Sequence, residues 1–229
     1  MSWLYLLLNG LTLSVPLLRS FEHRIAFYKK WKALFTGIAL TGAFFILWDV
    51  YFTHLGVWGF NPKYLIGVDI LNLPIEEWLF FVTVPFACMF IYEVLNYFIQ
   101  KDLLKNIYRP FFTILAILIL IIGIVYYDRI YTSVTFILTS VFIFIHLFII
   151  KKRYLSRFLL AYLVSLLPFV IVNGILTGSF IDEQIVWYDD TQNLGIRLFT
   201  IPIEDSIYML LLLMMNVSIY EWKKYDNQT

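Results

Sequence analysis

The segment LPIEEWLFFVTVPFACMFIYE, residues 73–93, places two adjacent acids, Glu76 and Glu77, ahead of a long apolar run. A run of about 20 apolar residues has the length of a membrane-spanning helix. Carboxylates are costly inside a bilayer, but in the first turn of a helix they complement its dipole. The segment therefore predicts a membrane helix that begins at Pro74, with two acids at the membrane boundary.

The whole chain has the composition of an integral membrane protein. Of its 229 residues, 61% are hydrophobic and 14% are charged, whereas a soluble domain has about 25% charged residues. The net charge of +1 gives no indication of nucleic-acid binding, and the single cysteine, Cys88, excludes an intrachain disulfide. Apolar runs predict an all-α integral membrane protein with seven transmembrane helices. These helices are predicted over residues 2–18, 31–53, 74–98, 110–127, 131–150, 158–177 and 202–222.

The distribution of basic residues predicts the orientation of these helices. Of the 17 Lys and Arg residues, all but Lys63, Arg129 and Arg197 fall in the loops after the first, third and fifth helices or in the C-terminal tail. Basic residues concentrate on the cytoplasmic side of membrane proteins. We therefore expect a multi-pass protein of the cell membrane, with its N-terminus outside and its C-terminus in the cytoplasm.

A second acidic motif, TIPIEDSIY at residues 200–208, repeats the first when Pro74 is aligned with Pro202, a shift of 128. The shift aligns three sets of residues: Pro74–Glu77 with Pro202–Asp205, Phe80 with Tyr208, and Tyr92–Glu93 with Tyr220–Glu221. It predicts two parallel three-helix repeats, helices 1–3 and helices 5–7, joined by helix 4. The corresponding units are residues 1–100, 101–130 and 131–229. Both acidic motifs then begin helices at the outer face.

The repeated acids suggest proton chemistry. If the third and seventh helices pack together, Glu76, Glu77, Glu204 and Asp205 converge, and like charges at low dielectric cannot all ionise. One neutral acid beside one anion can donate a proton and then stabilise a cation. Aromatic or polar side chains near the same face are candidates to stabilise a cation or to set the location of the proton: Asp49, Trp58, Phe80, Asn173, Trp187 and Tyr208. The alternative is that the acids only stabilise helix starts and the aromatic residues only form interfacial belts.

The sequence also suggests an order among the acids. Glu76 and Glu204 are expected to matter most, because the next residue of each pair points about 100° away around the helix. Glu204 is favoured as proton donor, since Asp189, Asp190 and Asp205 make its half the more acidic.

Another pair related by the same shift, Asp69 and Arg197, is a candidate clasp over the site. Two unrelated surface charges are the alternative, because exposed ion pairs contribute only about 0–1 kcal/mol.

Two stretches resemble the two halves of the membrane-integral lycopene cyclase family. They are WDVYFTHLGVWGFNPKYLIGVDILNLPIEEWLFF at residues 48–81 and VWYDDTQNLGIRLFTIPIEDSIY at residues 186–208. In that family the halves occur as two small subunits or fused, as they would be here. The resemblance implies that a terminal double bond of lycopene is protonated, an internal double bond attacks the cation, and a proton is lost. The resemblance implies β-ionone rings, first in γ-carotene and then in β-carotene. The sequence itself leaves open an ε ring and the closure of one end only.

The resemblance assigns the acid and base roles to Glu76, Glu77, Glu204 and Asp205. We expect no cofactor, because the reaction is redox-neutral and the chain has no dinucleotide fingerprint. We expect no metal either, because His23, His54 and His146 lie in different segments.

The implied partner is a carotenoid, lycopene, taken from the bilayer, with no nucleic acid. A homo-oligomer or association with other carotenoid enzymes stays open. Two other functions are compatible with the sequence. Parallel repeats and intramembrane acids also occur in small proton-coupled transporters, and a carotenoid-binding protein without catalysis would need the same apolar helices. Ring formation from lycopene distinguishes an enzyme from both.

Overall fold

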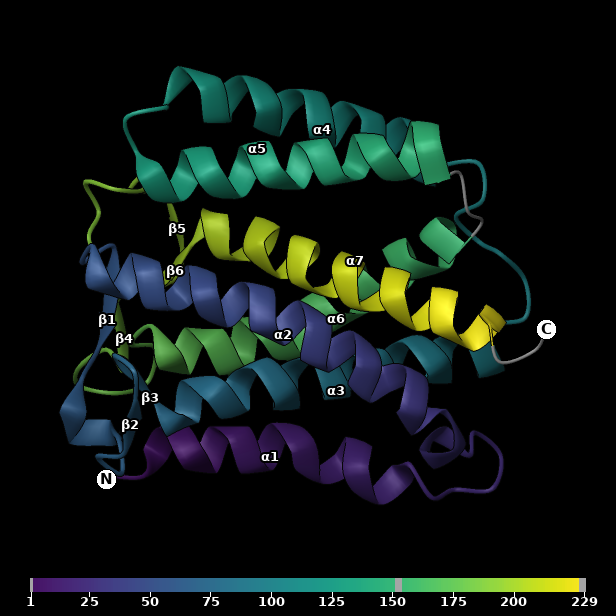
Figure 1. The fold of residues 1–229 in the computed structure, drawn as a ribbon, viewed down its shortest axis with the longest axis horizontal. Helices are drawn as coiled ribbons and strands as arrows, with labels where there is room; N and C mark the ends of the chain where they lie inside the picture. The colour runs from purple at the N-terminus through teal and green to yellow at the C-terminus, as the bar shows by residue number, and fades with distance from the viewer. Residues whose placement is uncertain (1, 151–153, 227–229) are drawn as a thin grey trace.

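The computed structural model of the protein describes residues 2–150 and 154–226, so the basic residues 151–153 of the predicted inner loop lie outside the described residues. Within these residues the helices α1 to α7 lie side by side, and the start of α1 and the end of α7 lie at opposite ends of the bundle (Figure 1). They are α1 (Leu4–Arg19), α2 (Trp31–His54), α3 (Ile75–Phe98), α4 (Tyr108–Val125), α5 (Ile130–Phe144), α6 (Tyr154–Leu176) and α7 (Ile203–Asp226). The predicted all-α class is confirmed.

Six of these helices, α2 to α7, are long and apolar enough to cross a membrane, as in a multi-pass membrane protein. The helix α1 is apolar but has only 16 residues. The predicted fifth helix ends where α5 and a π-helical turn, Ile145–Ile150, end together. Two predicted bounds differ by four residues: the seventh helix ends at Asp226 instead of Trp222, and the sixth begins at Tyr154 instead of Phe158. The earlier start is compatible with the charged Arg157, whose guanidinium donates to the carbonyl oxygens of Ile99 and Gln100, each at 2.6 Å.

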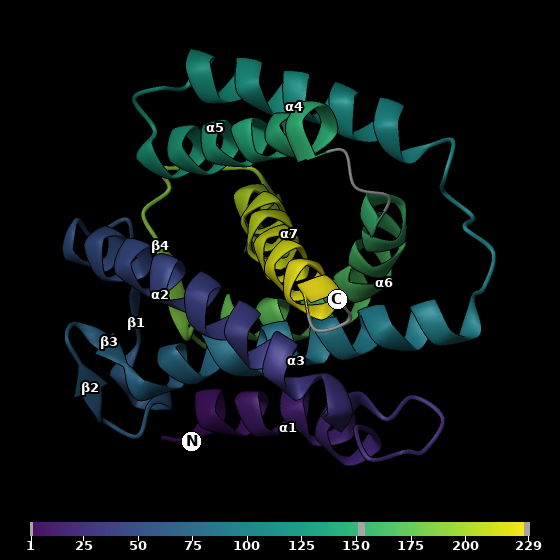
Figure 2. The same ribbon diagram turned by 45° about the vertical axis from the view of Figure 1, so that its right-hand side comes forward.

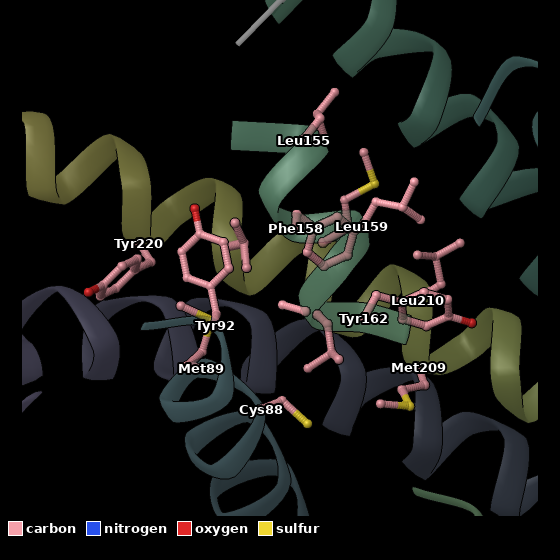
Figure 3. Close-up of a cluster of buried hydrophobic side chains, with 14 of the residues drawn as sticks. Cys88, Met89, Tyr92, Leu155, Phe158, Leu159, Tyr162, Met209, Leu210 and Tyr220 are labelled. Atoms are coloured by element: carbon pink, nitrogen blue, oxygen red, sulfur yellow. The ribbon is translucent and has the colours of Figure 1, made fainter. Parts of the chain in front are cut away.

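The helix α7 occupies the centre of the bundle, and α2, α3, α5 and α6 pack around it (Figure 2). On one side α4 and α5 form the antiparallel hairpin that their short connection predicts, and on the opposite side α1 packs against α3 (Figure 1). Side chains of α3, α6 and α7 meet in a buried apolar cluster that includes Met89, Phe158 and Leu210 (Figure 3). This cluster fixes α3 and α7 close together and brings their first turns to the same end of the molecule.

Short strands, which the sequence analysis did not predict, gather at the end of the bundle that holds the N-terminus (Figure 1). The strands β1 (Trp58–Phe60) and β4 (Val186–Tyr188) form an antiparallel pair. Two hairpins lead into the acidic helices: β2 (Asp69–Ile70) with β3 (Leu73–Pro74), and β5 (Arg197–Leu198) with β6 (Ile201–Pro202). Short 3₁₀ turns at Phe27–Lys30 and Pro62–Tyr64 complete the connections. Strand pairing satisfies backbone groups that would be costly to leave unpaired near a membrane.

The two hairpins adopt the same backbone conformation at positions that the repeat aligns with each other. Gly67 and Gly195 have φ angles of 81° and 69°, and Leu71 and Phe199 have φ angles of 59° and 56°. Positive φ is uncommon for a residue with a side chain. The sequence correspondence therefore extends to a strained turn ahead of each acidic helix.

The predicted clasp between Asp69 and Arg197 is not formed. The Arg197 guanidinium donates to Oδ1 of Asp190 at 2.5 Å and to the Thr200 carbonyl oxygen at 2.7 Å, both within its own loop. Asp69 is exposed in the other hairpin, where its strand pairs with Pro74. The acidic stretch before α7 supplies a nearer partner, so the alternative of unrelated surface charges is correct.

At the opposite end of the bundle, the repeated Tyr-Glu pairs bond to one another. Tyr220 donates to Oε1 of Glu93 at 2.7 Å, and Tyr92 donates to Oε1 of Glu221 at 3.0 Å. The Glu93 carboxylate, which is 3% exposed, also accepts from the ammonium groups of Lys30 and Lys224. These contacts anchor α3 to α7 at the far end from the acidic motifs, as the spacing along the helix predicted.

Candidate active site

Both acidic motifs occupy the first turns of α3 and α7, at the same end of the bundle (Figure 1). The sequence analysis expected the four acids to converge in one place, but they do not. Glu77 and Asp205 line a shared cavity together with Asp49 of α2, whereas Glu76 and Glu204 do not line it. Adjacent acids in one helical turn therefore have different surroundings.

Glu76 and Glu204 bind the loops that precede their helices. Oε1 of Glu76 accepts the backbone N–H of Ile66, and Oε1 of Glu204 accepts the backbone N–H of Leu194, each at 2.8 Å. Both side chains are fully buried, at 0% exposure. The Thr132 hydroxyl of α5 also donates to Glu204 at 2.6 Å. This geometry fits a positioning role, in which each carboxylate holds an outer loop against its helix.

The cavity between the motifs has a volume of about 60 Å³. Five of the six supporting residues predicted from the sequence line it: Asp49, Trp58, Phe80, Asn173 and Tyr208. Its walls are largely aromatic, and the β1–β4 pair adds Trp58, Phe60 and Tyr188 from the outer side. Three carboxyl groups thus meet in a small aromatic chamber.

The sixth predicted residue, Trp187, lies outside the cavity. Its side chain is 42% exposed, and its ring covers Gly59 on the paired strand, where a Cβ atom would lie only 2.3 Å from Trp187 Cζ2. Successive residues of a strand point to opposite faces. The neighbouring Tyr188 consequently faces the cavity instead.

Asp205 accepts three hydrogen bonds from neutral donors. They come from the hydroxyl of Tyr131 at 2.5 Å, the hydroxyl of Tyr188 at 3.0 Å and Nδ2 of Asn173 at 2.7 Å. Burial raises the pKa of Tyr188 well above its usual range, and the Asp205 charge raises it further, so this hydroxyl stays protonated and able to donate. Several donated hydrogen bonds stabilise a carboxylate anion.

Asp49 and Glu77 form a carboxyl pair on the other side of the cavity. Oδ2 of Asp49 is buried and has no hydrogen-bond partner among the described residues, which favours a proton on this side of the cavity because an unpaired buried charge is costly. Oε2 of Glu77 also accepts the Tyr5 hydroxyl at 2.5 Å, and Oδ1 of Asp49 accepts from Trp58 Nε1. Two adjacent buried carboxylates cannot both ionise. The Asp49–Glu77 side of the cavity can therefore hold a proton, and the Asp205 carboxyl group lines the same cavity.

Aromatic rings pack closely around the centre of this arrangement. The Tyr208 ring lies 4.9 Å from the ring of Phe45 and 5.2 Å from that of Trp48, measured between centroids. Aromatic faces attract cations, by about 2 kcal/mol or more when desolvated. The chamber can therefore supply a proton, a negative charge and a cation-tolerant wall.

Three tyrosines that hydrogen-bond the acids, Tyr5, Tyr131 and Tyr188, were missed in the sequence analysis. Tyr5 and Tyr131 lie near the first turns of α1 and α5, which run in the same direction as the acidic helices in the predicted topology. A search for hydroxyl donors near the outer ends of the odd-numbered helices would have found both. Tyr188 could have been found from the strand alternation with Trp187.

A family model described as lycopene cyclase matches the chain over residues 2–95 and 128–223. The chain belongs to the lycopene cyclase family. The two matched segments contain one acidic motif each and leave out the whole of α4. No curated protein and no solved structure gives a significant match to this lycopene cyclase family member. Family membership supports a general role as an enzyme of carotenoid cyclisation in carotenoid biosynthesis.

Proposed function

We propose that this member of the lycopene cyclase family converts the linear ends of lycopene to β-ionone rings by acid–base catalysis. The observation that carries the proposal is that three buried carboxyl groups, those of Asp49, Glu77 and Asp205, line one small cavity together with aromatic side chains. We assign a proton to the Asp49–Glu77 pair and the negative charge to Asp205. The catalytic assignment of these three acids is our own, and it gives Glu76 and Glu204 positioning roles.

In the first step, the Asp49–Glu77 pair gives its proton to the terminal double bond of the substrate. The new C–H bond leaves a tertiary carbocation on the carbon that carries the two terminal methyl groups. Both carboxyl groups of the pair are then ionised, and the adjacent cation balances the added negative charge. Asp205 and the rings of Trp58 and Tyr208 line the cavity where this charge develops. Preorganised groups of opposite charge stabilise such a transition state most effectively where water is excluded.

In the second step, an internal double bond attacks the cation and closes a six-membered ring. The positive charge moves into the ring, and a proton leaves a neighbouring carbon to form the ring double bond. A carboxylate of the cavity accepts that proton, which restores the starting protonation of the enzyme. One proton enters and one leaves, so neither electrons nor atoms are gained. The β1–β4 cover keeps water from trapping the cation as an alcohol.

The proposal includes a topology of seven crossings, with the short α1 as the first, and two parallel repeats fused through α4. The N-terminus and the acid site are outside and the C-terminus is cytoplasmic, on the basis of the distribution of Lys and Arg. We expect a cysteine introduced at Thr191, which is exposed between β4 and β5, to react with an impermeant maleimide on intact cells. The native Cys88 is buried and serves as the internal control. Labelling only after lysis would reverse the orientation.

The proposed activity is tested by adding lycopene in liposomes to the purified protein, without flavin, nicotinamide or metal. We expect γ-carotene and then β-carotene, because the chemistry is redox-neutral. A separate incubation with reduced flavin is expected to give the same rate. Unchanged lycopene in both incubations would favour a transporter or a non-catalytic carotenoid-binding protein, and conversion only with flavin would show that the cavity acids are insufficient.

A further inference from the structure

A second, much larger cavity of about 480 Å³ lies between α1, α3 and α6. Almost all of its lining is apolar, with side chains such as Leu11, Val84, Ala87, Phe169 and Ile171. We refer to it as the α1–α6 groove. It holds no carboxyl group among its lining residues, so it cannot take part in proton transfer itself.

The α1–α6 groove lies directly beside the acid cavity. Five residues line both: Phe80, Val84, Phe169, Asn173 and Met209. Along α3 the groove extends from Phe80 to Ile91, which is about 16 Å at 1.5 Å per residue. It therefore forms an apolar channel that begins at the acids and runs along the helices toward the other end of the bundle.

The groove is open to the surrounding lipid along part of its length. Leu11, Val15 and Ile171 line it and are 60%, 62% and 64% exposed. At the outer end the gap is closed, because Leu8 and Leu176 are buried in one apolar cluster. An apolar molecule in the bilayer can thus reach the acids from the side, whereas the strand-covered outer face blocks a route from water.

Helix-interior prolines line this opening on both sides. Pro16 of α1 and Pro168 of α6 border the groove, and proline removes a hydrogen bond inside a helix and bends it. The sequence repeat has no proline partner for Pro168. Under the shift of 128, Pro16 aligns with Phe144 and Pro168 with Leu40, so the interface related to this gap by the repeat has no proline at either position.

The corresponding surface of α7 is filled. The small groove residues Ala87 and Cys88 of α3 correspond, after the shift of 128, to Met215 and Asn216. Gly37 of α2 packs so closely there that an added Cβ would lie 3.2 Å from the Asn216 carbonyl oxygen. The repeat therefore gives the acids an apolar groove on the α1–α3–α6 side, while the related surface of α7 is filled.

We propose that the α1–α6 groove binds the polyene chain of the carotenoid, with the reacting end in the acid cavity. This inference rests on the proposed function. A carotenoid rod is about as long as the bilayer core is thick, roughly 30 Å, so the groove covers about half of it and the other half extends into lipid. A single groove then processes one end at a time, and the molecule must leave and return reversed before its second end reacts. A polyene is favoured over a lipid acyl chain because the groove leads directly to the acids.

The test fills the groove without touching the acids. Ala87→Phe places a ring inside it, and Ala39→Phe, on a lipid-exposed position of α2, is the matched control. Val15→Trp narrows the exposed opening and provides a second variant in case Ala87→Phe does not fold. Each is assayed for lycopene turnover in liposomes. Each is also combined with Glu77→Gln, purified from lycopene-accumulating cells, and its bound lycopene per protein is measured by visible absorbance.

We expect Ala87→Phe and Val15→Trp to lower both turnover and bound lycopene by about tenfold or more, the effect of overfilling an apolar site, while Ala39→Phe changes neither. Folded groove variants with wild-type turnover and binding would overturn the inference and leave an acyl-chain site, while the proposed function would stand. A wild-type protein that neither binds nor cyclises lycopene would instead overturn the proposed function itself.

Discussion

Replacing Glu77 by glutamine is expected to lower the turnover of lycopene by about 10²–10⁴-fold, the usual cost of removing a positioned general acid. Glutamine has the size of glutamate and can still accept the Tyr5 hydrogen bond, but it has no acidic proton to give to the substrate. The variant should still insert in the membrane. Pigment formed in lycopene-accumulating cells, divided by the amount of inserted protein, measures the effect.

The matched control for this variant is Glu76→Gln, one residue earlier in the same turn. Glu76 accepts the Ile66 N–H, so its loss should cost about tenfold or less, in line with one weakened hydrogen bond. The sequence-based order of the acids predicts the reverse, with Glu76 and Glu204 essential. The opposite result would be that Glu76→Gln abolishes turnover while Glu77→Gln keeps more than about a tenth of it, a loss in the range of one weakened hydrogen bond. The proton donor would then be an acid that faces the loop, as Glu76 does.

Asp205→Asn is expected to lower turnover by about 10²–10³-fold, as the loss of an electrostatic stabiliser does. An amide carries no charge to balance the carbocation. Its NH₂ group would also face one of the donors from Tyr131, Tyr188 or Asn173, so that hydrogen bond would be lost. Substrate binding should change much less, because the charge is needed only once the cation forms. Single-turnover kinetics with lycopene already bound isolate this step.

The control for Asp205→Asn is Asp69→Asn, the same substitution on the exposed hairpin before α3, which should leave turnover unchanged. Near-normal single-turnover rates in Asp205→Asn would show that the negative charge of Asp205 is not needed to stabilise the carbocation. Weakened lycopene binding with normal chemistry would assign Asp205 to the shape of the cavity instead.

The position of the helices and the shared end of the two acidic motifs could be predicted from the sequence. Long apolar runs fix the helices, and the repeat of the acidic motif fixes their common direction. The sequence could not show which acid of each pair faces the cavity. That choice depends on the loop backbone, since the N–H groups of Ile66 and Leu194 hold Glu76 and Glu204.

Contacts between residues that are far apart in the chain could not be predicted from the sequence either. Tyr5 reaches Glu77 across 72 residues, and Tyr131 reaches Asp205 across 74. Periodicity describes one helix at a time and contains no information about such pairs. The α1–α6 groove is equally invisible, because it results from how three helices separate. Apolar residues that line a channel and those that face lipid look the same in a sequence.

The most direct test of proton-initiated cyclisation is the mass of the product formed by the purified enzyme in D₂O. The mechanism adds a proton from an enzyme acid in exchange with solvent and removes a different hydrogen of the substrate. We predict that the product retains one deuterium for each ring closed and has no other change in composition relative to lycopene. A product that contains rings but no deuterium, or that has gained or lost hydrogen, would contradict the account.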